Sequence, residues 1–189
     1  MTLTLTLRGR VVTLEPLRVE HADRLWPAAD DDAIRAYWPM PLRTLEEMRA
    51  QCSHLLAIPS SHPYLIRTTD GRAAGQTCLY AIDPDHRSAT IGWTFITAPY
   101  RRTAVNTETK LLMLTRAFEE RGLERVQFDV DARNTLSQQA LERIGAMREG
   151  VLRKHKVLWD GFVRDTVVFS IVKDEWPAVQ AGLEAKMTR

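Results

Sequence analysis

A strand-to-helix junction at residues 95–108 holds residue types suited to binding a charged ligand. A strand pattern ends here, a short turn carries Arg101, Arg102 and Thr103, and a helix pattern begins near Ala104. The first turn of a helix has backbone N–H groups without intrahelical partners, and the helix dipole makes that end electropositive. Two arginines add forked donors, and a small residue lets an anion approach the backbone. The junction therefore suits a phosphate or pyrophosphate group, with a solvated pair of arginines as the alternative.

The elements ahead of this junction are predicted from hydrophobic periodicity. Residues 10–15 are expected to form a strand, residues 19–28 a short helix, and residues 30–41 a mixed loop or broken helix. Thr44 and Glu47 have the spacing of a capping box. The helix that follows is expected to bury a face made of Leu45, Met48, Cys52, Leu55 and Leu56. Three strands of an antiparallel meander are then expected, at residues 63–69, 75–82 and 88–96, with Asp70-Gly71 as the first turn.

The elements after the junction alternate between helix and strand. A helix with an apolar stripe ends at Gly122, and residues 125–131 alternate as a strand with one buried face. The inward residues of that strand are predicted to be Val126, Phe128 and Val130, and the outward ones Gln127, Asp129 and Asp131. Asn134 is expected to cap a helix that ends at Gly145 and buries Leu136, Ala140 and Ile144. Two strands around Asp160-Gly161, at 147–158 and 163–172, and a helix at 174–187 complete the order.

This order of elements predicts an α/β (α+β) domain. A mixed, mostly antiparallel sheet of six to seven strands is expected, flanked by helices. The helix between residues 88–96 and 125–131 acts as a crossover, so these two strands are expected to lie parallel. The 189 residues are 44% hydrophobic and 26% charged, values that fit one globular domain over residues 1–189.

The composition also argues against several classes of partner. With 26 Lys and Arg against 24 Asp and Glu, the net charge of +2 gives no reason to expect nucleic-acid binding. Cys52 and Cys78 lack the spacing of a zinc site, so we expect no metal and two free thiols in a reducing cytoplasm, with a disulfide as the alternative. The opening MTLTLTLRGRVVTLEP lacks the features of a signal peptide, and no stretch is apolar enough for a membrane span.

Most of the chain resembles GNAT-superfamily N-acetyltransferases of the RimJ/RimL-like, ribosomal-protein type. The matching segments are RVVTLEPLRVEHADRLW (10–26), IGWTFITAPYRR (91–102), AFEERGLERV (117–126), DARNTLSQQALERIGAMREGVLR (131–153), DG (160–161) and DTVVFSI (165–171). The most specific part is Asn134-x-x-Ser137-x-x-Ala140-Leu141-Glu142-x-x-Gly145-Ala146. The resemblance implies a GNAT fold with splayed fourth and fifth strands, and acetyl-CoA as the acetyl donor.

The family's pyrophosphate-loop pattern, Arg/Gln-x-x-Gly-x-Gly/Ala, reads here Arg101-x-x-Ala104-x-Asn106. Ala104 disfavours positive φ, and Asn106 is bulkier than the family residue although it could cap the helix. If the two strands diverge, backbone groups of Phe95 and Ile96 lose ladder partners that the pantetheine arm can replace. The residues expected to bind acetyl-CoA are Phe95, Ile96, Arg101, Arg102, Thr103, Ala104, Val105, Asn106, Asn134, Ser137 and Arg143.

Acetyl transfer needs a neutral amine, a polarised thioester carbonyl and a proton for the departing thiolate. Many family members supply that proton from a tyrosine after the fifth strand, a region without tyrosine here. The tyrosines lie at Tyr37, Tyr64, Tyr80 and Tyr100. The candidate catalytic residues are therefore Ser137, as acid or donor to the sulfur, and Asn134, with a water relay as the alternative. A backbone N–H of Phe95 or Ile96 could polarise the carbonyl.

The acceptor side is less defined by the sequence. Thr90 stands where family members often carry Glu, so the candidate bases are Asp129, Asp131 and His155, each with a purely structural role as the alternative. An enzyme without a dedicated base would depend on positioning alone. Trp38 is a candidate wall of the acceptor pocket or a core residue. Arg143 begins a basic stretch, residues 143–156, that could meet the CoA 3′-phosphate, attract an acidic substrate or be a solvated face.

These observations predict a cytoplasmic N-acetyltransferase that moves acetyl from acetyl-CoA to a primary amine by direct attack. The acceptor is expected to be a protein N-terminus or a small-molecule amine. The alternative is a non-catalytic acyl-CoA-binding sensor or interaction module with a GNAT fold. Exposed hairpin edges make a homodimer plausible.

Overall fold

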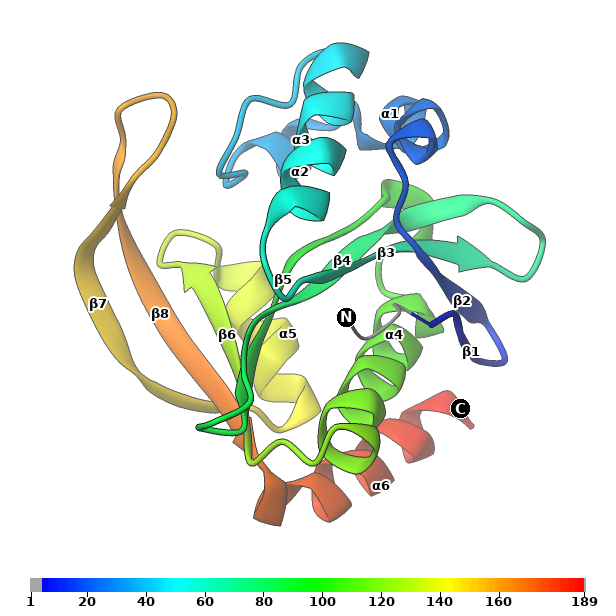
Figure 1. Cartoon of the computed structure of the whole chain (residues 1–189), viewed down its shortest axis with the longest axis vertical. Helices are drawn as coiled ribbons and strands as arrows, with labels where there is room; N and C mark the ends of the chain where they lie inside the picture. The colour runs from blue at the N-terminus through cyan, green and yellow to red at the C-terminus, as the bar shows by residue number, and fades with distance from the viewer. Residues whose placement is uncertain (1–4, 189) are drawn as a thin grey trace.

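One sheet organises the protein. The computed structural model describes residues 5–188 and orders the strands β1-β2-β3-β4-β5-β6-β8-β7 in an eight-stranded sheet (Figure 1). The strands are β1 (Leu7–Arg8), β2 (Val12–Pro16), β3 (His62–Thr68), β4 (Ala73–Asp83), β5 (Ser88–Ile96), β6 (Arg125–Asp131), β7 (Met147–Val157) and β8 (Val163–Val172). Neighbouring strands are antiparallel except β5 and β6, which are parallel. The mixed sheet, the meander and the crossover are confirmed.

The sheet has more strands than the six to seven predicted. The additional strand, β1, is two residues long and folds back on β2 through a tight turn in which the Gly9 N–H donates to the Val12 carbonyl at 2.8 Å. So short a strand leaves little periodicity in a sequence. The strand expected at residues 10–15 corresponds to β2, which begins two residues later than predicted, at Val12. Residues 1–4 of the opening segment lie outside the described residues.

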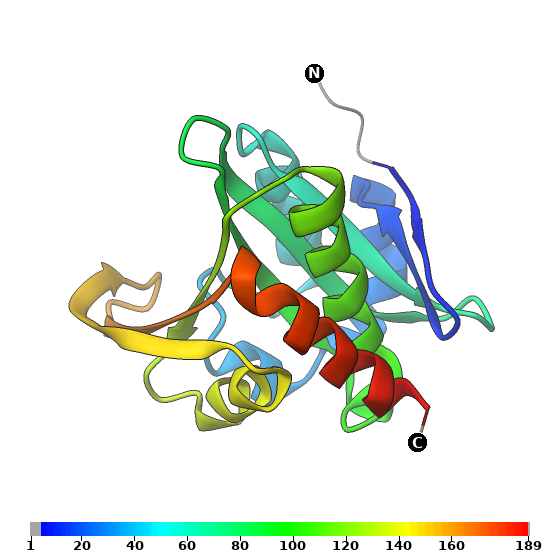
Figure 2. The ribbon, with the colours of Figure 1, turned by 90° about the horizontal axis from the view of Figure 1, so that it is seen from below.

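Six α-helices cover the two faces of the sheet in residues 5–188. They are α1 (Ala22–Ala29), α2 (Asp32–Arg35), α3 (Leu45–Ala57), α4 (Ala104–Thr115), α5 (Thr135–Ile144) and α6 (Trp176–Met187). The first three lie on one face and the last three on the other (Figures 1 and 2). None of these helices is both long and apolar enough to cross a membrane.

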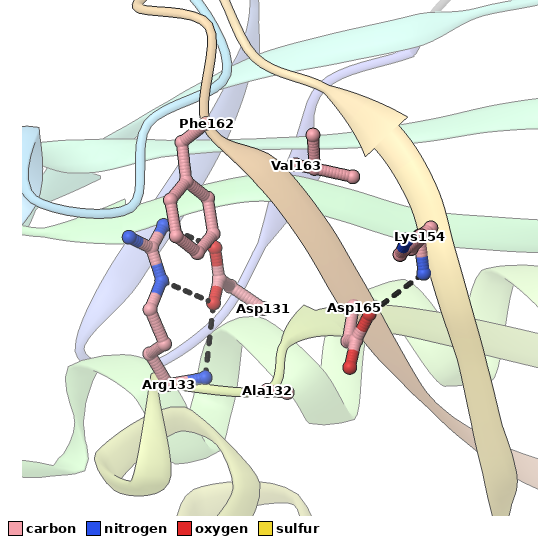
Figure 3. A pocket seen from close by; sticks show the side chains of 7 residues that line it. All are labelled: Asp131, Ala132, Arg133, Lys154, Phe162, Val163 and Asp165. Carbon is pink, nitrogen blue, oxygen red and sulfur yellow. Dashed lines mark hydrogen bonds and ion pairs between the residues drawn. The ribbon is translucent and has the colours of Figure 1, made fainter.

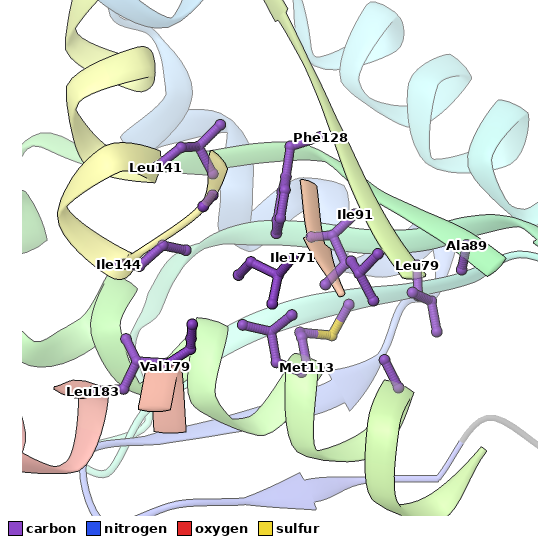
Figure 4. Close-up of a cluster of buried hydrophobic side chains, with 14 of the residues drawn as sticks. Leu79, Ala89, Ile91, Met113, Phe128, Leu141, Ile144, Ile171, Val179 and Leu183 are labelled. Carbon is purple, nitrogen blue, oxygen red and sulfur yellow. The ribbon is translucent and has the colours of Figure 1, made fainter. Parts of the chain in front are cut away.

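Each face has its own buried cluster. On the face of α4, α5 and α6, Met113, Ile144 and Val179 pack toward Ile91 and Phe128 of the central strands (Figure 4). The cluster on the other face joins α1 and α3 to β3 and β5, and it contains Leu25, Met48, Cys52, Leu55, Leu65 and Phe95. The sheet centre, where β5 meets β6, is therefore supported from both sides.

The predicted helix boundaries follow their capping residues. Thr44 and Glu47 form the capping box of α3, and the Asn134 side chain caps α5. Gly145, at φ 94°, adopts the left-handed conformation that ends α5. Among residues 5–188, Cys52 and Cys78 are free and buried, so the expectation of free thiols is confirmed.

Three predicted burial assignments are wrong. Leu56 is 46% exposed although Leu55 beside it is fully buried, so Leu56 lies on the outward side of α3, and Leu136 in the first turn of α5 is 69% exposed. The buried face of α5 is made by Leu141 and Ile144 instead. Asp131, expected on an outward face, is 4% exposed because neighbouring segments close over the end of β6.

Candidate active site

The parallel strands β5 and β6 separate after a short paired stretch. Pairing runs only as far as Thr90 and Gln127, although β5 continues to Ile96 and β6 to Asp131. Beyond Thr90, the edge of β5 that faces β6 has no strand partner within the described chain. Backbone groups at such an edge need another partner, so the gap can accept an extended, amide-rich ligand. This is the predicted splay.

A bulge in β5 lies beside this gap and is held by buried amides. Trp93 has a φ of 51°, and the β4–β5 register shifts at this point. The Gln76 Nε2 donates to the Trp93 carbonyl at 3.2 Å, and the Gln51 Nε2 donates to the Gln76 Oε1 at 2.9 Å. The Trp38 Nε1 completes the chain by donating to the Gln51 Oε1 at 2.9 Å. Buried glutamines thus fix the backbone next to Phe95.

Trp38 itself lies behind β5. Its side chain is 7% exposed, and its ring meets the rings of Trp93 and Phe95 edge-on at 5.9 and 5.4 Å. The Phe95 side chain is 5% exposed in the same cluster, so only its backbone is available to a ligand. Of the two readings of Trp38, the structure supports a core residue that supports the site from behind.

The start of α4 follows the end of β5. Thr103 is the N-cap, and its hydroxyl accepts from the Val105 N–H at 3.3 Å, so Asn106 lies in the first turn rather than at the cap. The Val105 side chain is 2% exposed, which leaves its backbone for binding. The small Ala104 is half-buried at the first helical position. The predicted electropositive helix start is therefore present at the mouth of the gap.

The two arginines before α4 have different environments. The Arg101 guanidinium is held by Asp31 at 2.5 Å and by the Ile96 carbonyl at 3.1 Å. Arg102 is exposed, has a φ of 60°, and makes no hydrogen bond or ion pair within residues 5–188. Arg102 is thus the one whose guanidinium can meet an anion without losing an existing contact.

The start of α5 closes the far side of the gap. Asn134 follows β6, and its Oδ1 accepts from the Ser137 N–H at 3.0 Å. The Ser137 side chain is half-buried, and its hydroxyl makes no hydrogen bond to any described residue. Asn134 therefore caps α5, and Ser137 has a hydroxyl available for a ligand.

Asp131 and Arg133 form a hydrogen-bonded ion pair at the end of β6. Asp131 accepts from the Arg133 N–H, Nε and Nη2 at 2.9, 2.9 and 2.7 Å (Figure 3). Burial acts to raise the pKa of Asp131, but the hydrogen bonds from Arg133 outweigh it and hold the pKa below its ordinary value. With both oxygens engaged, Asp131 is a poor proton acceptor.

Arg133 also joins three segments above the gap. Its guanidinium lies 3.6 Å from the ring centre of Phe162, in the β7–β8 turn, and 5.5 Å from that of Tyr37. In the same way, Arg43 lies 4.9 Å from the ring centre of Trp159. These contacts connect the β7–β8 hairpin to the segment between α2 and α3, on the side of the sheet opposite α4 (Figure 1).

Two residues that the sequence reasoning did not place in the site lie next to Asp129. The Tyr80 ring lies against Gly92 of β5, and Asp129 of β6 is one of the charges that raise its pKa, although burial is the larger cause. Arg164 of β8 is 6% exposed, and burial lowers the pKa of its guanidinium. Asp129 accepts from the Gln127 Nε2 at 2.9 Å. Strand register, which a sequence does not specify, brings these side chains together.

Two predicted residues lie apart from this group. His155 is exposed on β7, which β8 separates from β6. Arg143 is exposed near the end of α5, where its carbonyl accepts from Lys186 of α6. The structure therefore brings Asp129 and Ser137 to the gap but not His155.

The other chemical groups of the chain are less suited to catalysis. Burial raises the pKa of the Cys52 thiol to about 11 and that of the Cys78 thiol to about 12, so neither is a ready thiolate nucleophile. Within residues 5–188, no group of three or more His, Cys, Asp or Glu side chains could hold a metal ion.

Comparison with known proteins identifies relatives with the same fold. The model of the acetyltransferase (GNAT) domain family matches residues 12–147. A candidate ribosomal N-acetyltransferase of Bacillus subtilis (strain 168), YdaF, is 33% identical over 107 residues, 57% of each chain. The match thus spans little more than half of that relative's length.

Solved structures match over nearly the whole chain. A candidate acetyltransferase from T. thermophilus is 39% identical with a TM-score of 0.91, covering 99% of both chains. RimJ from Mycobacterium smegmatis, solved in complex with CoA-disulfide, is 25% identical with a TM-score of 0.83, covering 96% of this chain and 94% of that one. The splayed strands, the α4 start and these matches agree, and the chain belongs to the acetyltransferase (GNAT) domain family of acyl-CoA-dependent N-acetyltransferases.

Proposed function

We propose that this protein transfers the acetyl group of acetyl-CoA to a primary amine by direct attack of the amine on the thioester. The observation that carries the proposal is the gap between β5 and β6, which opens next to the α4 N-terminus. The acceptor is a protein N-terminus or a small-molecule amine. The name of the Bacillus subtilis relative, which refers to the ribosome, supports a protein acceptor.

The residues around the gap fit acetyl-CoA. The unpaired edge of β5, near Phe95 and Ile96, offers backbone groups to the amides of the pantetheine arm. The first turn of α4 offers N–H groups at Ala104 and Asn106 to the pyrophosphate, with Arg102 as the nearby free cation. Arg143 would meet the 3′-phosphate end. Neither Cys52 nor Cys78 is accessible to form a covalent acyl-enzyme, because both thiols are buried.

The chemistry then depends on groups on both sides of the gap. A backbone N–H of Phe95 or Ile96 polarises the thioester carbonyl. Ser137 donates a proton to the departing thiolate, directly or through water, because its hydroxyl is otherwise unbonded within the described chain. Asp129 receives the proton of the acceptor ammonium, since it has a single side-chain hydrogen bond while both oxygens of Asp131 are engaged.

Two measurements test this function. Acetyl-CoA at millimolar concentration should raise the melting temperature of the purified protein, because a ligand that binds the folded state stabilises it. Release of free CoA should then depend on an added amine. No stabilisation contradicts the proposal, while stabilisation without turnover of any amine supports the acyl-CoA-binding sensor instead.

A single variant tests the assigned acid. Ser137→Ala should lower kcat by about tenfold to a hundredfold, within the range for loss of a general acid, with little change in the KM for acetyl-CoA. Turnover equal to that of the unmodified enzyme would remove the catalytic role of Ser137. Thr135→Ala, a change of an exposed hydroxyl in the same turn, is the matched control and should leave kcat unchanged.

A further inference from the structure

Arg164 is a buried cation whose donors lack partners. The residue is 6% exposed, and its Nε and Nη2 are buried without a hydrogen bond to any described residue. An arginine keeps its charge in proteins, and burying that charge is costly unless acceptors surround it. Native proteins rarely leave such groups unsatisfied, and an exception calls for an explanation such as a missing ligand.

The acidic side chains nearby do not fill this role. Asp129 and Asp131 both act on the charge of Arg164, yet neither forms a hydrogen bond or an ion pair with it. The oxygens of Asp131 are taken by Arg133, and Asp129 is bonded to Gln127. The Nε and Nη2 donors of Arg164 are therefore available to a ligand.

Strand register places Arg164 on the acceptor side of the gap. Paired residues on adjacent strands share a face, so Asp131 shares its face with its partner Thr166 in β8, and Arg164 is two residues from Thr166 on that strand. This is also the face of Tyr80, because Tyr80 pairs with Thr90, and Thr90 with Gln127. The face lies opposite the cluster formed by α4, α5 and α6.

Thr166 is the second unsatisfied group in this place. Its side chain is fully buried, at 0% exposure, and its Oγ1 has no hydrogen-bond partner within the described residues. Residues two apart on a strand point in the same direction, so the Thr166 hydroxyl and the Arg164 guanidinium face one region. A hydroxyl beside a guanidinium is a suitable pair of donors for one carboxylate.

We propose that Arg164 and Thr166 form a subsite for a carboxylate carried by the amine acceptor, so that the enzyme acetylates amines that also bear a carboxylate. This inference rests on the proposed acetyltransferase function and names the acceptor class. The subsite lies beside Asp129, which faces the ammonium end of the same acceptor. Arg164 selects the acceptor and does not take part in bond making.

The local charge favours a carboxylate over a phosphate group. Arg133 and Asp131 neutralise each other, which leaves Arg164 facing Asp129. An acceptor with one ammonium and one carboxylate adds no net charge to this arrangement. A phosphate dianion would place surplus negative charge next to two aspartates, which is unfavourable where little water screens the charges.

The β7–β8 hairpin, which contains Arg164 and Thr166, is tied to other segments by exposed side chains. The hairpin is joined to the segment before α3 by the contact of Arg43 with Trp159, and to the α5 start by that of Arg133 with Phe162. All four residues are exposed, so we expect the acceptor to enter by parting these contacts rather than by disturbing a buried cluster.

Matched acceptor pairs test the inference on the unmodified enzyme. One pair is Ser-Glu-Ala-amide and Ser-Gln-Ala-amide, which differ by a side-chain carboxylate, and the other is L-alanine and L-alaninamide, which differ by an α-carboxylate. CoA release with acetyl-CoA should show a kcat/KM at least tenfold higher for the carboxylate member of one pair. The favoured pair tells whether the acceptor is a peptide N-terminus or a free amino acid.

Variants then assign the preference to Arg164. Arg164→Gln should raise the KM for the favoured carboxylate acceptor at least tenfold and leave the amide member within twofold. For the carboxylate acceptor, the KM of Arg164→Lys should lie between that of the unmodified enzyme and that of Arg164→Gln. The matched control is Arg8→Gln, which alters an exposed arginine on β1 at the far end of the sheet and should leave both acceptors unchanged.

The inference is overturned if the unmodified enzyme shows no preference in either pair, including no turnover of any member. It is also overturned if folded Arg164→Gln or Arg164→Lys loses activity equally toward both members. If Arg164→Gln does not fold, the preference of the unmodified enzyme and the KM of Arg164→Lys decide. Failure of acetyl-CoA to stabilise the protein contradicts the proposed function itself, whereas acetylation without carboxylate preference contradicts only this inference.

Discussion

The two sides of the β5–β6 gap use different kinds of polar group. On the cofactor side, where we propose that acetyl-CoA binds, the donors are backbone N–H groups at the starts of α4 and α5, which follow the caps Thr103 and Asn134. On the side proposed for the acceptor, the polar groups are side chains from three strands, among them Tyr80, Asp129 and Arg164. Backbone donors persist when a side chain is substituted, whereas side-chain donors can change with the acceptor. Under the proposed function, the backbone donors bind the acetyl donor and the side chains select the acceptor.

The largest expected effect comes from blocking the cofactor side at Ala104. Ala104→Glu places a carboxylate and added bulk in the first turn of α4, where the proposed pyrophosphate site uses the helix N–H groups. The KM for acetyl-CoA should rise about a hundredfold, roughly 2.7 kcal/mol, and the thermal stabilisation by acetyl-CoA should vanish.

The matched control is Ala178→Glu, which puts the same side chain in the exposed first turn of α6. It should leave acetyl-CoA binding unchanged. An Ala104→Glu enzyme that still binds acetyl-CoA normally would break the assignment of the cofactor side.

The next effect tests the buried amides that hold the β5 bulge between the two sides. Gln51→Leu leaves the Trp38 Nε1 without an acceptor and the Gln76 Oε1 without a donor. We expect a loss of about 2 kcal/mol in the free energy of unfolding, since unsatisfied buried groups each cost about 1–3 kcal/mol. Because the Trp93 carbonyl is held through Gln76, we expect kcat to fall by a larger factor than the factor by which the KM of either substrate changes.

Gln139→Leu, at an exposed position of α5, is the control for this change and should alter neither stability nor kcat. A stable Gln51→Leu protein with normal kcat would show that the bulge does not depend on this chain of amides.

The next prediction concerns Lys110, a buried lysine of α4 that lies beside Phe128 of β6. Its side chain is 6% exposed, the Nζ lies 5.3 Å from the ring centre of Phe128, and burial lowers its pKa to about 8. Since the unfolded chain keeps the lysine proton up to its ordinary pKa of 10.5, stability should rise with pH between about 8 and 10.5. Lys110→Met should add roughly 2 kcal/mol to the free energy of unfolding at pH 7.

Chemical denaturation at pH 7 and pH 9.5 measures both consequences of Lys110. The gain from Lys110→Met should be smaller at pH 9.5, because the native lysine is then mostly neutral. Equal gains at both pH values would contradict the lowered pKa.

The smallest expected effect separates the two roles of Asn134. Asn134→Ala removes the cap from α5 and should cost about 1 kcal/mol of stability. Asn134→Asp keeps a capping oxygen, so it should keep the stability, but it loses the amide N–H₂ that would bond the pantetheine arm. A rise in the KM for acetyl-CoA with Asn134→Asp at unchanged melting temperature supports the binding role. An unchanged KM makes Asn134 a cap alone.

The fold was largely predictable from the sequence because its signals are local. The Thr44–Glu47 capping box, the Asn134 cap and the turns at Asp70-Gly71 and Asp160-Gly161 each concern residues close in the chain. The two-residue strand β1 was missed because it is too short to show a period. Leu136 was assigned to the core wrongly, because periodicity does not tell which turns of a helix are covered by neighbouring elements.

The site divides in the same way. The start of α4 could be found from the order of strand, turn and helix. The Arg101–Asp31 pair could not, because it joins residues that are 70 positions apart. Tyr80, Gln51 and Arg164 were missed for the same reason, since a polar residue in an apolar strand becomes informative only when its neighbours across the sheet are known.

A crystal structure of the protein with bound CoA tests the central claim most directly. We expect the pantetheine arm along the unpaired edge of β5 near Phe95 and Ile96, and the pyrophosphate at the N–H groups of the first turn of α4. Arg164 should face the CoA thiol end from the opposite side of the gap. A CoA molecule bound elsewhere, or a pyrophosphate held without the α4 start, would contradict the account.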